Sequence, residues 1–161
     1  MNKHVEYLKK LNACSEAVEF AGKYSSLQKA WDACENGSWM LWLCGRLSGP
    51  PDSDSRKKVV LVACVCARLA LKYTKDTRAK ACIETAERYV RGKATLDEVR
   101  TAAAAFDAYA AAYAAAAAFD AYAAAYAAAD ATYATRVKTL KKCAEIVRKH
   151  YPKVPKGEPH E

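Results

Sequence analysis

The sequence predicts an all-α fold, a multi-helix bundle, from three observations. Alanine, leucine, lysine and glutamate, all good helix formers, dominate the 161 residues. Only six Gly and five Pro are present, and three of the prolines lie in the last ten residues. β-Branched residues gather in a single short run, KKVVLVACVCA. We therefore expect residues 1–152 to form one helical domain and residues 153–161 to form a flexible C-terminal tail.

The first third of the chain predicts three short helices with clear stops. An apolar pattern over residues 14–22 ends on a glycine, and the segment 25–37 begins on a serine cap. The pair Asn36 and Gly37 suits a left-handed turn that closes this second helix. The third helix, within 38–49, is apolar nearly all round, so we expect it at the centre of the bundle.

Two longer helices are predicted in the middle of the chain. The valines of residues 56–73 are compatible with a strand, but the apolar run continues to Leu71, which is too long for an ordinary strand. The candidate N-caps of this helix are Ser53, Asp54 and Ser55. The next helix covers residues 76–91, and Gly92 stands just past its end.

A long alanine-rich helix is predicted for the C-terminal third. Thr95 and Glu98 form a capping box, and no Gly or Pro follows until Pro152. A continuous helix over residues 96–149 would be about 75 Å long, at 1.5 Å per residue.

A 13-residue unit is repeated inside this segment, at 106–118 and 119–131, and the copies differ only at Ala117 and Asp130. Each helical residue rotates by 100°, so an insertion of 13 residues turns the downstream helix by about 220° and places the aromatic faces of the two copies on opposite sides. Removing one copy brings the apolar residues back onto one stripe. The pattern therefore indicates a tandem duplication inside an amphipathic helix.

The repeat does not match a functional array. Threonines do not recur on one face, as an ice-binding helix would need, and residues 102–134 contain no Lys or Arg to accompany stacked bases. Either the chain bends near residues 114–118, or one aromatic face is left uncovered. An uncovered face favours self-association, so a homodimer through this helix is our hypothesis.

Charge and cysteine content indicate the kind of partner and the cellular compartment. A formal net charge of +8 favours an acidic partner, whether nucleic acid, an anionic membrane or a protein. Seven cysteines, an odd number, and an N-terminus without an apolar run of secretory length indicate reduced thiols in the cytoplasm. No stretch has the length and apolar character of a membrane span.

Catalysis requires polar groups that converge, and the sequence predicts no such group. The histidines, His4, His150 and His160, lie near the ends of the chain. Cys64 and Cys66 fall on roughly opposite sides of one helix, which suits core packing better than a shared metal. No phosphate-binding glycine loop is present. We expect no enzyme activity, no catalytic residue, no metal and no cofactor.

Two surfaces are candidates for binding. Trp39, Trp42 and Arg46 share one side of their helix; they either pack in the core or form a hot spot for a protein partner. The basic residues of the C-terminal helix form either a solvated face or a weak, salt-dependent patch for nucleic acid. The residues of this second candidate are Lys141, Lys142, Arg148 and Lys149.

The stretch LNACSEAVEFAGKYSSLQKAWDACENGSWMLWLCGRL, at 11–47, resembles the Imm-five-like family of bacterial immunity proteins. The segments RKKVVLVACVCARLAL and KCAEIVRKHYP are similar to the family's next helix and its end, so the resemblance covers most of residues 8–152. It implies an all-α, antitoxin-like binder from a bacterial or phage genome that neutralises a cognate toxin by occlusion. No catalytic or binding residue carries over from the family. A net charge of +8 suits an acidic toxin surface better than a basic nuclease.

The alternative is a helical nucleic-acid-associated protein that uses the basic C-terminal helix. The distribution of charge separates the two hypotheses. One continuous basic stripe would favour nucleic acid, whereas scattered charge around an apolar tryptophan patch would favour a protein partner.

Overall fold

The computed structural model describes residues 2–73, 77–104 and 133–157, and every regular element within these ranges is helical. The predicted all-α class is confirmed. The helices are α1 (Lys3–Lys10), α2 (Ser15–Gly22), α3 (Leu27–Ala33), α4 (Gly37–Arg46), α5 (Asp54–Ala70), the 3-10 turn η1 (Leu71–Tyr73), α6 (Thr77–Val90), α7 (Leu96–Ala104) and α10 (Tyr133–His150). None of the described helices is both long and apolar enough to cross a membrane.

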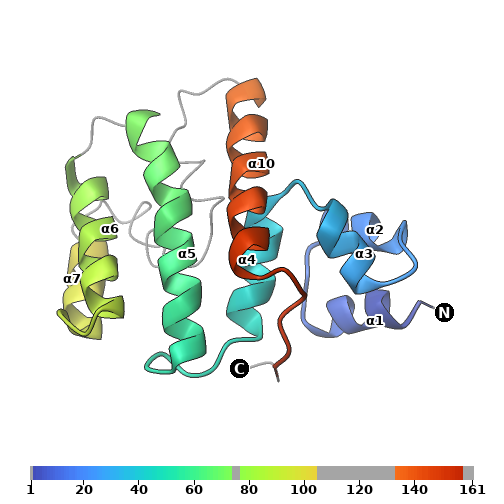
Figure 1. The fold of residues 1–161 in the computed structure, drawn as a ribbon, viewed down its shortest axis with the longest axis horizontal. Helices are drawn as coiled ribbons and strands as arrows, with labels where there is room; N and C mark the ends of the chain where they lie inside the picture. The colour runs from blue at the N-terminus through green and yellow to red at the C-terminus, as the bar shows by residue number, and fades with distance from the viewer. Residues whose placement is uncertain (1, 74–76, 105–132, 158–161) are drawn as a thin grey trace.

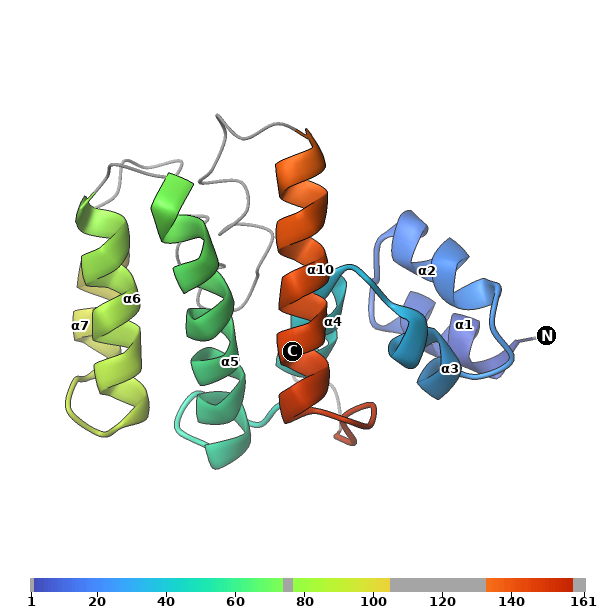
Figure 2. The same cartoon turned by 45° about the horizontal axis from the view of Figure 1, so that its top comes forward.

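The helices form a row with α5, α10 and α4 at its centre (Figure 1). On one side α6 packs against α5, and α7 packs against α6. On the other side α1, α2 and α3 form a small layer beyond α4 and α10, as the turned view shows (Figure 2). The central position of α4 is the one that its apolar sequence predicts.

The main core lies where α4, α5 and α10 meet. Leu41 of α4, Val62 and Cys66 of α5, and Val147 of α10 are completely buried. The side chain of Cys64 points the other way, into a smaller cluster beneath α6. The two cysteines therefore lie on different sides of α5, as the helical spacing predicts.

Most predicted helix ends are found. Ser26 and Ser53 accept hydrogen bonds from the backbone N–H three residues on, which caps α3 and α5. Thr95 and Glu98 form the capping box, with bonds of 2.7 and 3.1 Å. Gly92 has a φ of +69° and closes α6.

The expected left-handed turn at Asn36 and Gly37 is wrong. Asn36 has a φ of −105° and is the N-cap of α4, because its side chain accepts hydrogen bonds from the backbone N–H groups of Ser38 and Trp39. Gly37 is the first residue of α4, and a Cβ there would lie 2.6 Å from the backbone N of Ala144. This glycine is needed for the close approach of α4 to α10.

Helix α1 was not predicted from the sequence. It is short and mostly polar, and only Leu8 within it is buried, together with Leu11 just beyond its end. Asn12 then takes a φ of +62°, which turns the chain toward α2. The signal was present in the sequence and was not used: Val5, Leu8 and Leu11 are spaced three residues apart and lie on one side of the helix.

Helices α7 and α10 lie at the two ends of the predicted 96–149 helix, and the repeat at 106–131 lies outside the described residues. The single long helix and the homodimer through it stay predictions. Within α10, Val147 is buried as expected, but Val137 is 44% exposed. Since α4 begins level with Ala144, it covers the second half of α10 and not the first.

The chain after α10 contacts the α3 region. Gln28 donates a hydrogen bond to the carbonyl of Pro152 (3.3 Å) and accepts one from the N–H of Val154 (3.0 Å). Residues 158–161 of the predicted tail lie outside the described residues.

A bidentate ion pair ties α5 to α6, and it predicts a pH dependence of stability. Arg68 donates to both carboxylate oxygens of Glu87, at 2.6 and 2.8 Å, and this interaction holds the pKa of Glu87 below its ordinary value of 4.5. A lowered folded-state pKa stabilises the protein above about pH 4.5, and that contribution is lost as the pH falls through the folded value.

We expect Glu87→Gln to lower the free energy of unfolding by about 1 kcal/mol at pH 7. The difference from wild type should shrink in urea titrations below about pH 4.5, where the carboxylate of the unfolded chain becomes protonated. A difference that stays constant from pH 7 to pH 3 would show that the ion pair contributes nothing.

Candidate functional site

One side of α4 faces outward. Trp39, Trp42, Gly45 and Arg46 are half-buried, whereas the other six residues of this helix are buried. At 100° per residue these four positions fall on one arc of the helix. We call these four residues the α4 outward face. The structure thus brings together the three predicted protein-binding residues and adds Gly45, which the sequence did not single out.

An apolar pocket opens between this face and the layer of α1, α2 and α3. Its empty volume, about 420 Å³, includes open solvent at its mouth, and its lining is almost entirely apolar. Trp39 and Trp42 line it from α4, and Phe20 lines it from α2. The rings of Phe20 and Trp39 are 5.8 Å apart in a tilted arrangement, which holds the indole of Trp39 at the pocket. Trp42 has no ring contact of this kind within the described part of the chain.

The third tryptophan has a structural role. Trp31 is only 4% exposed, and its Nε1 donates a 3.0 Å hydrogen bond to the carbonyl of Tyr151. The guanidinium of Arg148 donates to the carbonyls of Trp31 and Cys34 at the end of α3. These contacts fix the α3 side of the pocket to α10.

Arg46 lies one turn beyond Trp42. Its Nε is buried and has no hydrogen-bond partner in the part of the chain that the structure describes. Buried polar atoms in folded proteins nearly always have a partner, so this donor calls for an explanation.

The structure divides the four predicted nucleic-acid residues into two pairs. Lys141 forms an ion pair with Glu35 at 2.6 Å, which raises the pKa of Lys141. Arg148 donates a hydrogen bond to the carbonyl of Cys34, just past the end of α3. Lys142 and Lys149 are exposed. Only this second pair presents its charge outward without a described partner.

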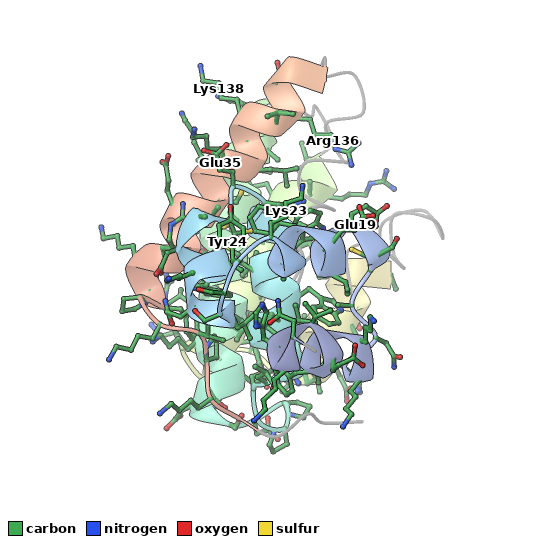
Figure 3. All side chains as sticks on the ribbon, turned by 90° about the vertical axis from the view of Figure 1, so that its right-hand side faces the viewer. Glu19, Lys23, Tyr24, Glu35, Arg136 and Lys138 are labelled. Carbon is green, nitrogen blue, oxygen red and sulfur yellow. The ribbon has the colours of Figure 1, made fainter. Side chains whose placement is uncertain are left out.

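Charges of both signs share the face that carries α2 and the upper part of α10 (Figure 3). Glu19 and Lys23 project from α2, and Glu35 stands beside α10. Arg136 and Lys138 leave α10 on opposite sides. This face carries scattered charge rather than one basic stripe.

The buried thiols are poorly suited to nucleophilic chemistry. Burial raises the pKa of Cys44 and of Cys64 to about 12, so both are neutral thiols at pH 7. All seven cysteines are free. Within the described ranges, no three His, Cys, Asp or Glu side chains gather as a metal site would need.

Comparison with known proteins gives the family. A family model described as Imm-5 like putative immunity protein matches residues 50–153, which is more than half of the chain. The chain belongs to this family. No curated protein and no solved structure matches it.

In this Imm-5 like protein the family match begins after α4 and spans α5 to α10. The α4 outward face and the three helices around the pocket precede the matched residues. The description of the family suggests an immunity role but does not cover this site, which has to be argued from its own geometry.

Proposed function

We propose that this Imm-5 like protein is a non-enzymatic helical binder that neutralises a bacterial toxin by occluding it, and that the α4 outward face makes the central contact. The family supports the immunity role. The choice of this face depends on one observation, that the half-buried Trp39 and Trp42 both line an apolar pocket. Tryptophan and arginine are the residues most enriched in the energetic centres of protein interfaces.

Occlusion needs a rigid surface rather than a reactive group. The polar contacts between α3 and α10 hold the pocket open on one side, while Phe20 supports Trp39 on the other. A preformed surface loses little conformational entropy on binding, which favours affinity. We place the binder in the cytoplasm, where seven free cysteines persist as thiols.

The nucleic-acid alternative rests on Lys142 and Lys149, which are exposed and seven residues apart, so they lie on the same side of α10. Two phosphate contacts would give only weak, strongly salt-dependent binding. Arg148 donates hydrogen bonds to carbonyls inside the protein, and the exposed Lys141 pairs with the exposed Glu35, which reduces the positive charge of the predicted patch.

The test is protection of growth followed by stoichiometry. We expect co-expression to restore growth of bacteria that express one toxin domain from a panel of bacterial toxin domains. With the purified toxin, inhibition should rise linearly and reach completion at one binder per toxin. A control with Lys142→Glu and Lys149→Glu should protect equally well.

Two results would contradict this function. Complete inhibition at a small fraction of one equivalent would mean that the chain acts catalytically on the toxin. Failure to protect against any of these domains would mean that it is not their immunity protein.

A further inference from the structure

We infer that the α4 outward face binds an acidic segment of its partner, in which a bulky apolar side chain stands next to a carboxylate. The apolar side chain enters the pocket, the carboxylate pairs with Arg46, and the partner's main chain passes over Gly45. This inference rests on the proposed function and names the chemistry of the partner.

Arg46 is half-buried and its side chain has no hydrogen bond or ion pair with the residues that the structure describes, and it is the first feature that points to such a partner. A guanidinium presents its N–H groups in a fixed planar fork, and a carboxylate accepts from this fork through two parallel hydrogen bonds. The Nε is closed off from the surface, whereas the two terminal nitrogens are not, so the carboxylate pairs with these two nitrogens. An acidic side chain is therefore the group that best satisfies Arg46.

Gly45 is the second feature. Gly45 lies in the last turn of α4, and glycine allows another backbone to approach closely because it has no side chain. At Gly37 of the same helix that neighbour is α10. At Gly45 a Cβ would meet nothing within 4 Å. The described fold explains the first glycine and not the second, and the close approach of a partner's main chain explains Gly45.

The pocket next to these residues is the third feature. Its lining is almost entirely apolar, which favours an apolar side chain over a polar one. Trp42 lies both in the lining of the pocket and one turn from Arg46. A side chain in the pocket and a carboxylate at Arg46 can therefore come from neighbouring residues of one segment.

Charge favours a protein segment over a nucleic acid at this face. The net charge of +8 attracts an acidic partner. However, Glu16 and Glu19 are exposed on α2, beside the pocket residue Ala17. A polyanionic strand would pass these carboxylates and be repelled, whereas a single carboxylate directed at Arg46 avoids them.

The experiment selects a phage-displayed library of random peptides on the full-length chain. We expect enrichment of peptides that place Leu, Phe or Trp beside Asp or Glu. Arg46→Gln should weaken the binding of a selected peptide at least tenfold, and the matched charge change Lys142→Gln on α10 should leave it unchanged.

Gly45→Ala separates binding from folding. The added methyl should raise the melting temperature by about 2–4 °C, because alanine is the better helix former. It should still weaken the binding of the selected peptide at least tenfold. Loss of binding with increased stability cannot come from a damaged fold.

Other outcomes overturn the inference. They are the absence of any enriched peptide, a motif without an acidic residue, or a selected peptide that binds both variants as tightly as wild type. Competition by a single-stranded oligonucleotide would show that the face binds nucleic acid. A wild-type dimer that Gly45→Ala converts to monomer would make a second copy the occupant. Protection against a toxin is measured separately, so a failure of this inference can be distinguished from a failure of the proposed function.

Discussion

Replacing Gly37 with alanine is expected to lower the free energy of unfolding by about 3 kcal/mol, the upper part of the range for overpacking a core. The added Cβ would lie 2.6 Å from the backbone N of Ala144, and a backbone atom cannot rotate away as a side-chain end can. Helices α4 and α10 would have to separate, which opens the core around Leu41 and Val147. Urea denaturation monitored by circular dichroism measures the change.

The matched control is Gly45→Ala, the same substitution in the same helix. It should stabilise the protein by up to about 1 kcal/mol, since the helix gains a better residue and meets no neighbour within 4 Å. If both substitutions stabilise the protein to the same degree, α4 and α10 do not pack as closely as described.

Trp31→Ala is expected to cost about 3–5 kcal/mol, the range for removing a large aromatic side chain from a core. Trp31 is 4% exposed and donates a hydrogen bond to the carbonyl of Tyr151, so its loss leaves a cavity and releases the end of α10 from α3. Thermal and urea unfolding both report the change.

Trp42→Ala serves as the comparison, because Trp42 is half-buried and makes no such bond to the described residues. It should cost clearly less stability than Trp31→Ala while abolishing protection against the toxin. Equal losses of stability would remove the distinction between a structural and a binding tryptophan.

Local signals in the sequence predict the local features of this fold. The capping box of Thr95 and Glu98, the glycine at position 92 and the placement of Cys64 and Cys66 depend on a few neighbouring residues, and all are found. Grouping Trp39, Trp42 and Arg46 on one side of a helix depends only on helical spacing.

Features that depend on distant contacts could not be predicted. Gly37 looks like a helix stop until α10, more than a hundred residues later, is seen packed against it. Arg148 belongs to a basic run in the sequence, yet it serves the carbonyls at the end of α3. The sequence did contain a signal for Gly45 that was not used, because a glycine within an otherwise strongly helical segment marks an unusual position.

The most direct test of a binding face on α4 is the ¹⁵N NMR spectrum of the three tryptophan indoles. Each indole N–H gives its own signal, and a toxin against which the protein protects can be added stepwise. We expect the signals of Trp39 and Trp42 to shift or broaden up to one equivalent, while that of Trp31, bonded to the carbonyl of Tyr151, stays in place. Binding that leaves Trp39 and Trp42 unchanged would contradict the assignment and place the toxin on another surface.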